Sequence, residues 1–174
     1  ANFLRGVPIW ATLIALTVAG KPVLGMVSAP ALGQQWWGAE GLGAWTRTTG
    51  DREPRKLAVS QVAQMGDAIV NYNSFPGWVD DGREKQVRSL AMAGWRARAI
   101  GDFWPYMLVA EGSVDVCGET DLQPYDIAAL VPIVREAGGE YSSLDGDNSV
   151  WEGSALATNG ILHEEALSYT RTQA

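Results

Sequence analysis

The sequence predicts an α/β fold of the layered α+β type. Strand-like segments fill its first half, whereas helices alternate with strands in its second half. The 174 residues are enough for a single domain with a sizeable core, and 47% of them are hydrophobic while 19% are charged. No internal repeat, low-complexity tract or linker interrupts the pattern. We therefore expect residues 1–174 to belong to one domain.

Apolar and β-branched residues dominate the first half and predict strands. The apolar run at residues 7–20 is too short to span a bilayer, and we interpret it as strand and not as a secretory signal. The first two strands are expected to be buried, and Trp36 and Trp37 are expected to pack in the core or at a subunit interface. The predicted strands cover residues 9–18, 23–28, 34–39 and 68–73, with hairpin and loop at 38–54.

Apolar side chains at helical spacing predict the helices of the second half. Asp102 is expected to be the N-cap of the second helix, whereas Pro124 opens the third helix and Gly138 closes it. The predicted helices cover residues 81–94, 102–111, 124–137 and 161–171, and the predicted strands cover 113–118, 140–143 and 155–158.

Charge and the rare residue types exclude several classes of function. A net charge of −7 disfavours nucleic acid or an anionic membrane surface as a partner. The one cysteine, Cys117, excludes an intrachain disulfide and a cysteine-based zinc cluster, and the one histidine, His163, excludes a histidine-rich metal site. We expect Cys117 to lie in the core and His163 to be solvated. No targeting signal is recognisable, so the expected location is the cytoplasm.

The residues with the clearest chemical pattern lie around the start of the third predicted helix. Asp126 falls in the first turn of that helix, and Glu119 lies seven residues upstream at the end of a strand. A carboxylate on a rigid element suits a metal that prefers oxygen ligands. The same position also suits an acid that only compensates the helix dipole, so the pattern by itself leaves both interpretations open.

A resemblance decides between them. The run Asp126-Ile127-Ala128-Ala129, followed by Glu-Ala-Gly-Gly at residues 136–139, resembles the C-terminal signature of the inositol-monophosphatase superfamily, Trp-Asp-x-Ala-Ala and then Glu-Ala-Gly-Gly. Tyr125 stands in place of the usual Trp. Leu130 replaces a usual Gly, as in the histidinol-phosphatase branch of the superfamily.

The resemblance implies a fold and a chemistry. The fold would be the αβαβα sandwich of these phosphatases, with residues 1–174 as the C-terminal part of a single phosphatase domain. The activity would be hydrolysis of a small phosphomonoester with two or three Mg²⁺ ions per site. Asp126 would be a metal ligand and Glu119 a substrate contact, and this chain would hold no further catalytic residue. The family's usual state implies a homodimer.

The first residues extend the resemblance. Ala1-Asn2-Phe3 is similar to the stretch that follows Asp-Pro-Ile-Asp-Gly-Thr in the superfamily, a motif that carries metal ligands and is absent from these 174 residues. The resemblance therefore implies that the chain lacks the front layers of the fold. We expect the 174 residues alone to show negligible turnover and to expose apolar sheet surface.

Other segments resemble the histidinol-phosphatase branch, namely residues 25–32, the Trp36-Trp37 pair and residues 95–103. Asp102 lies where inositol monophosphatases carry a small or hydroxyl residue, and a carboxylate there suits an amine-bearing substrate. With Arg98 as a further substrate contact, the resemblance implies hydrolysis of L-histidinol phosphate in histidine biosynthesis. Two alternatives remain: an inositol-1-monophosphatase or related sugar phosphatase, and a non-catalytic fragment or pseudoenzyme.

Overall fold

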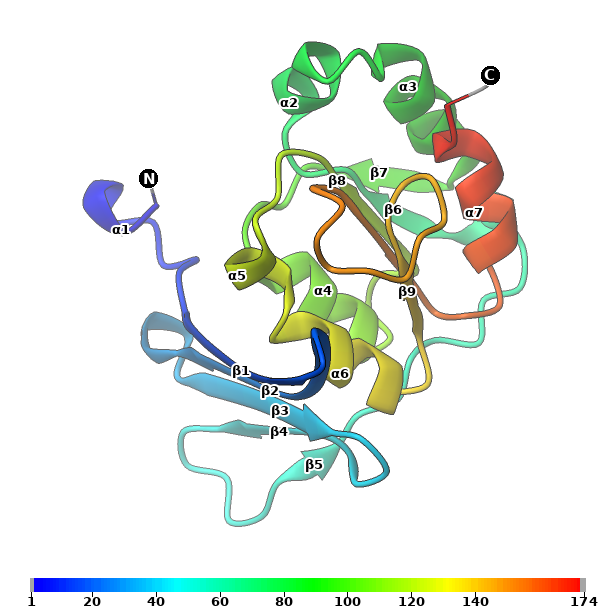
Figure 1. The fold of residues 1–174 in the computed structure, drawn as a ribbon. Coiled ribbons are helices and arrows are strands. Elements are labelled where there is room, and N and C mark those ends of the chain that lie inside the picture. Colours follow the sequence, from blue (N-terminus) through cyan, green and yellow to red (C-terminus); the bar gives the residue numbers. More distant parts are fainter. Residues whose placement is uncertain (1, 173–174) are drawn as a thin grey trace.

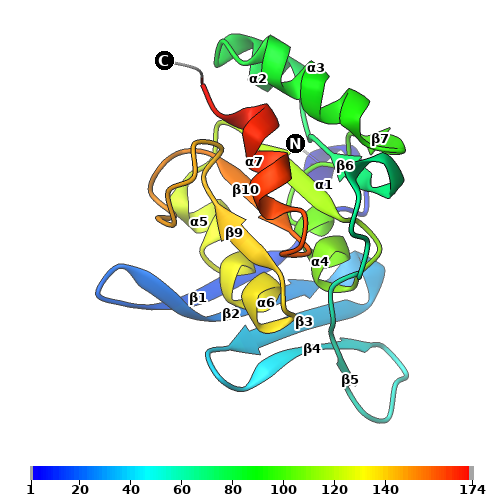
Figure 2. The same ribbon diagram turned by 90° about the vertical axis from the view of Figure 1, so that its right-hand side faces the viewer.

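Sheets and helices alternate in layers through the molecule (Figure 1). The computed structural model describes residues 2–172, and within them two five-stranded sheets enclose a layer formed by helices α4, α5 and α6. Helices α2, α3 and α7 cover the far side of the second sheet, as the view turned by 90° also shows (Figure 2). The helices are α1 (Asn2–Arg5), α2 (Phe75–Asp80), α3 (Glu84–Ala93), α4 (Trp104–Ala110), α5 (Pro124–Ile127), α6 (Leu130–Glu136) and α7 (His163–Thr170).

The first sheet is an antiparallel meander in the order β1-β2-β3-β4-β5. Each strand pairs with the next one in the chain, and short turns link the first four strands. Its strands are β1 (Thr12–Val18), β2 (Lys21–Ala29), β3 (Gln34–Ala39), β4 (Gly43–Thr48) and β5 (Arg55–Lys56). The single-turn helix η1 (Pro30–Leu32) lies between β2 and β3.

The second sheet is mixed, in the order β7-β6-β8-β10-β9. Strand β6 pairs in parallel with both β7 and β8, and the remaining pairs are antiparallel. The carboxyl ends of β7, β6 and β8 therefore meet at one edge of this sheet. The strands are β6 (Ile69–Asn71), β7 (Arg96–Arg98), β8 (Val116–Glu119), β9 (Glu140–Ser142) and β10 (Ala155–Thr158), and the single-turn helix η2 (Met65–Asp67) precedes β6.

Close contact between the first sheet and the helical layer depends on two glycines. A Cβ atom added to Gly25 in β2 would lie 1.8 Å from the backbone oxygen of Ala129, and one added to Gly38 in β3 would lie 3.0 Å from the Cα atom of Ile133. Only a residue without a side chain allows the sheet to approach the helix backbone this closely. The larger hydrophobic core lies at this contact, and in it Trp36 and Phe103 pack with ring centroids 5.9 Å apart.

The outer face of the first sheet is apolar. The strand register places Ile14 opposite Met26, Met26 opposite Trp37, and Trp37 opposite Trp45, so that one row crosses four strands. Within residues 2–172 no helix covers this face (Figure 1). Strand β1 is exposed along most of its length, so the prediction that both first strands are buried is wrong for β1. The reason is its position at the sheet edge, which the local pattern does not specify.

Two further predictions require correction, and one helix has no counterpart among the predicted elements. The helix predicted at residues 124–137 is divided into α5 and α6, because Pro132 has no N–H group to donate to the carbonyl of Ala128. Helix α2 was not predicted, although Ser74-Phe75-Pro76 opens it. Asp102 is not an N-cap: helix α4 begins at Trp104, and the backbone at Asp102 adopts a left-handed conformation with a φ of +59°.

His163, predicted to be solvated, is buried at the start of α7. Its Nδ1 lies 3.1 Å from Thr158 Oγ1 and its Nε2 lies 3.0 Å from Ser142 Oγ. Burial lowers the pKa of the imidazole, because removal from water disfavours its charged form. Cys117 is buried in β8, as predicted. No helix within residues 2–172 has both the length and the apolar character needed to cross a bilayer.

The glycine contact gives a test of the packing. Gly25→Ala should lower the free energy of unfolding of the complete gene product by about 3 kcal/mol or more, because the new methyl group meets backbone that cannot rotate away. Urea denaturation measures this quantity. Gly66→Ala is the matched control, since no atom lies within 4 Å of its added Cβ, and it should change stability by less than about 0.5 kcal/mol. Equal effects of the two substitutions would contradict the packing described above.

Candidate active site

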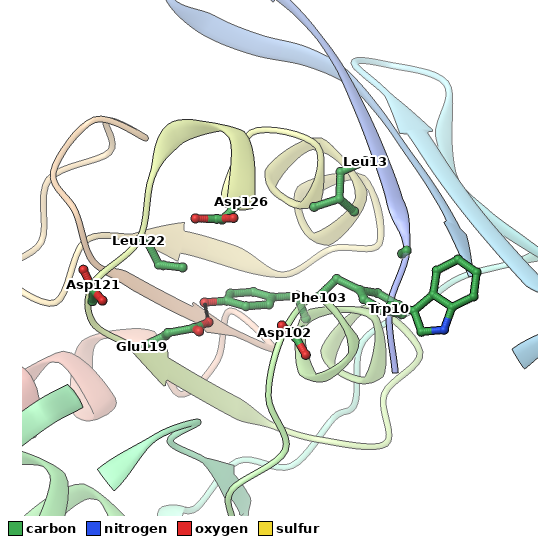
Figure 3. Close-up of a pocket in the computed structure, with 10 residues that line it drawn as sticks. Trp10, Leu13, Asp102, Phe103, Glu119, Asp121, Leu122 and Asp126 are labelled. Atoms are coloured by element: carbon green, nitrogen blue, oxygen red, sulfur yellow. Dashed lines mark hydrogen bonds between the residues drawn. The ribbon is translucent and has the colours of Figure 1, made fainter. Parts of the chain in front are cut away.

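A cavity of about 330 Å³ opens between the helical layer and the edge at which the parallel strands end. Segments that are far apart in the sequence contribute to it: the chain before and within β1, the start of α4, the end of β8 and the start of α5 (Figure 3). The lining residues are Trp10, Ala11, Leu13, Asp102, Phe103, Tyr106, Glu119, Asp121, Leu122 and Asp126. Three of the four residues proposed from the sequence thus line one cavity.

Asp126 enters the cavity from the first turn of α5. Its Oδ2 atom accepts a hydrogen bond of 2.9 Å from the backbone N–H of Gln123, which fixes the orientation of the carboxylate. In Figure 3 the carboxylate of Asp126 lies near Leu122, and it faces the same space as the side chain of Glu119. The oxygen that is not used in the cap is therefore free to bind a cation.

Glu119 ends β8 and is buried, with only 6% of its surface exposed. The hydroxyl of Tyr106 donates to its Oε2 at 2.8 Å, and the side-chain amide of Asn73 donates to its Oε1. The pKa of Glu119 is raised to about 7, mainly by burial and also by the charges of Asp102 and Asp126, whereas the hydrogen bonds from the two donors partly offset the rise. Glu119 is thus a carboxyl group close to half ionisation at neutral pH.

Asp102 reaches the cavity because of its backbone, not because of a helix cap. Asn71, at the end of β6, accepts a 2.7 Å hydrogen bond from the N–H of Ile100 and donates a 3.0 Å hydrogen bond to its carbonyl. This two-point contact holds the loop that turns at Asp102. The side chain of Asn2 donates to the carboxylate of Asp102, whose pKa is raised mainly by burial and also by Asp126.

Arg98 is not brought together with the three acids. It lies at the end of β7, its side chain is exposed, and its guanidinium donates a 2.9 Å hydrogen bond to the carbonyl of Ala97. It is absent from the residues that line the cavity, and its role as a substrate contact stays a prediction.

The structure adds site residues that sequence reasoning missed. Asp121 lines the cavity from a left-handed turn two residues after Glu119, and a search of the loop between β8 and α5 for further acids would have found it. Tyr106 lies one helical turn after Phe103 on the same face of α4. Asn73 has no comparable signal, because its partner is 46 residues away in the sequence.

The charges around the cavity have one sign. Four carboxyl side chains line it, and no Lys, Arg or His is among its lining residues. Such a cavity attracts cations and repels a phosphate dianion unless metal ions neutralise the acids. Carboxylate oxygens are the ligands that Mg²⁺ prefers, so Asp126 fits as one ligand of such an ion. Within residues 2–172, however, no set of three or more His, Cys, Asp or Glu side chains is placed to hold a metal.

Comparison with known proteins agrees with this geometry. Residues 1–173 match the inositol monophosphatase family. The chain belongs to this family. It is 51% identical over 172 residues to a histidinol-phosphatase of Streptomyces coelicolor and 49% identical over 167 residues to a histidinol-phosphatase of Mycobacterium tuberculosis. The matches cover 97% and 96% of this chain, respectively, but 64% of each relative, so the chain spans less than two-thirds of their length.

Solved structures of the inositol monophosphatase family share the fold. An inositol monophosphatase from Zymomonas mobilis superposes with a TM-score of 0.86 at 29% identity, and the match covers 97% of this chain and 65% of that protein. An inositol monophosphatase from Anabaena gives a TM-score of 0.84 at 26% identity over 97% of this chain and 66% of its own. These likenesses confirm the layered α/β fold expected from the sequence. The family match over residues 1–173 confirms that the resemblance extends to the first residue of the sequence, although Ala1 itself lies outside the described residues.

The environment of Glu119 predicts its titration. In the complete gene product without divalent cations, Glu119 should take up a proton as the pH falls through about 7, well above the usual value of 4.5. Because its pKa is higher in the folded state, this carboxyl group disfavours folding increasingly as the pH rises from 4.5 to 7. Carbon-13 NMR of labelled glutamate carboxyls, assigned with Glu119→Gln, measures the midpoint. A midpoint below pH 5 would contradict the proposed burial.

Proposed function

We propose that residues 1–174 form the C-terminal part of a Mg²⁺-dependent phosphomonoesterase that hydrolyses L-histidinol phosphate to L-histidinol and phosphate. The observation that carries the proposal is the cavity lined by four carboxyl groups and by no basic side chain. The names of the relatives from Streptomyces coelicolor and Mycobacterium tuberculosis support the same substrate. The reaction belongs to histidine biosynthesis.

The sign of the charge favours an amine-bearing substrate over a cyclitol. L-Histidinol phosphate carries an ammonium group, which the carboxylates of Glu119 and Asp102 would bind by charge-assisted hydrogen bonds. The hydroxyls of an inositol gain much less from a cavity with this charge. Apolar side chains such as Leu13 and Phe103 also line the cavity and would pack against the imidazole ring. Arg98 would assist from outside the cavity.

Asp126 would hold one Mg²⁺ ion, and two or three ions per site would require further ligands from residues that precede this chain in the complete protein. Bound Mg²⁺ supplies neutralisation of the phosphoryl charge. The carboxylates of this chain would orient the alcohol portion of the substrate. Water then displaces this alcohol at phosphorus, and little further orientational entropy of the substrate is lost in that step. Glu119 and Asp102 would therefore act on selectivity, and Asp126 on the metal.

A second candidate is hydrolysis of myo-inositol 1-phosphate. It is favoured by a relative from Mesorhizobium japonicum named inositol-1-monophosphatase, which is 29% identical over 174 residues. A non-catalytic fragment is the alternative from another class. A cytoplasmic location and a homodimeric assembly complete the proposal, the first from the biosynthetic role and the second from the usual state of the family.

Asp102→Ala tests the substrate. In the complete gene product it should lower kcat/KM for L-histidinol phosphate about tenfold or more and leave that for myo-inositol 1-phosphate within about threefold, because only the first substrate offers an ammonium group. Phosphate release from the two substrates, assayed side by side, gives both values. Asp67→Ala, which removes an exposed acid from η2, is the control. Equal losses on both substrates would rule out Asp102 as a selectivity residue.

The 174 residues by themselves should show negligible Mg²⁺-dependent turnover, because no set of three potential metal ligands is present within residues 2–172. The test compares phosphate release by this chain with release by the product of the complete gene. Turnover by the chain at the rate of the complete product would refute the proposed need for upstream ligands. Inactivity of both would favour the pseudoenzyme.

A further inference from the structure

Glu119 is a buried carboxyl group that is held by two uncharged hydrogen-bond donors. Both of its oxygens have a protein donor, and the donors come from different elements. Tyr106 donates from α4, and Asn73 donates from the loop that follows β6. Neither donor is charged. The negative charge of Glu119 is therefore stabilised by hydrogen bonds but not neutralised by a protein cation.

This difference matters for ligand binding. A buried carboxylate paired with arginine would carry no net attraction for a second cation, whereas the charge of an ionised carboxylate held by a hydroxyl and an amide is not cancelled by a protein cation. Tyr106 stays protonated as a donor, because burial and the neighbouring Glu119 charge raise the pKa of its phenol well above its ordinary value. The pair thus holds the carboxylate in place and leaves its charge available to the cavity.

The placement of both donors is specified by the fold. Tyr106 is 1% exposed and packs in the larger core, so its hydroxyl has little freedom to turn away. Asn73 has a φ of +53°, a conformation that asparagine tolerates better than most residues. A Cβ atom added to Gly101 would lie 2.9 Å from the Oδ1 atom of Asn73, so the loop before Asp102 also packs against this amide. The side chain of Asn73 thus contacts Glu119 directly and also the loop that leads to Asp102.

We propose that Tyr106 and Asn73 are positioning residues that present Glu119, ionised and fixed in direction, to the ammonium group of an amino-alcohol phosphate. This inference rests on the proposed function for its ligand, and on the two hydrogen bonds for its geometry. Neither residue needs to touch the substrate. Their effect is exerted through the carboxylate that they hold.

The charges that face Glu119 set the direction of the expected pH effect. Asp102 and Asp126 face it across the cavity and raise its pKa, as does burial, whereas the bonds from Tyr106 and Asn73 lower it. Cys117 on the same strand is buried and uncharged, since burial raises the pKa of its thiol. Loss of the Tyr106 hydroxyl therefore raises the pKa of Glu119 above about 7 and reduces its ionised fraction at neutral pH.

The test compares three proteins: the complete gene product as the parent, its Tyr106→Phe variant, and its Tyr141→Phe variant as the matched control. Tyr141 is also buried, but its hydroxyl donates to the carbonyl of Ser149, outside the cavity. Calorimetry measures the affinity for L-histidinol between about pH 6.5 and 8.5. The ratio of variant to parent affinity is compared at each pH, which cancels the titration of the ligand. Carbon-13 NMR measures the Glu119 midpoint in the same proteins.

Tyr106→Phe should weaken L-histidinol binding about tenfold at neutral pH, and the ratio should recover as the pH rises. The Glu119 midpoint should move upward, affinity for inorganic phosphate should stay unchanged, and Tyr141→Phe should behave as the parent. Asn73→Gly, which keeps the left-handed backbone and removes the donor, should act in the same direction. These results support the proposal and guard against a variant that fails to fold.

Two results would overturn it. An unchanged Glu119 midpoint in both variants would show that the two donors do not tune this carboxyl group. Equal losses for L-histidinol and inorganic phosphate, with a ratio that does not depend on pH, would show a merely structural role. Should the parent bind no L-histidinol, the proposed function fails, and the Glu119 midpoint still decides separately whether the two donors tune it.

Discussion

Repulsion among four carboxyl groups is the constraint on which the site depends. Asp102, Glu119, Asp121 and Asp126 line one cavity that has no basic lining residue. Charges of one sign at short range in a partly buried space cost several kcal/mol unless cations enter or protons bind. Burial, and to a smaller extent the neighbouring carboxylates, raises the pKa values of Glu119 and Asp102, so protonation of these two groups is favoured. A cavity of this kind is built to receive cations, whether metal ions or an ammonium group.

The fold maintains this repulsion by holding each acid on a different support. The parallel strands β7, β6 and β8 end at the same edge, so that the residues after them converge. The helical cap at Gln123 fixes Asp126, and the double hydrogen bond from Asn71 fixes the loop before Asp102. The glycine contact of β2 with Ala129 brings the first sheet close to the junction of α5 and α6, so that residues before and within β1 supply an apolar part of the cavity lining.

Membership of the inositol monophosphatase family explains the fold, and the carboxyl groups of the cavity are the basis of the proposed substrate. The same fold serves solved structures described as inositol monophosphatases, so the fold by itself does not select an alcohol. Selection is proposed to come from Asp102 and Glu119 and from the uncharged donors that hold Glu119. The apolar row on the outer face of the first sheet, exposed at Ile14 and half-buried at its other three residues, agrees with a chain that spans less than two-thirds of the length of its relatives.

The sequence by itself determined the family, the layered fold and the carboxylates Asp126 and Glu119, because short motifs encode residues whose spacing is local. It also predicted Asp102 as a substrate contact, a role that stays a proposal, but it wrongly made this residue a helix N-cap, since the left-handed turn there depends on a contact with a distant strand. Only the tertiary structure decided that Tyr106 and Asn73 hold Glu119 and that His163 is buried. Those contacts join side chains of different elements, and no local periodicity records which of these side chains will meet.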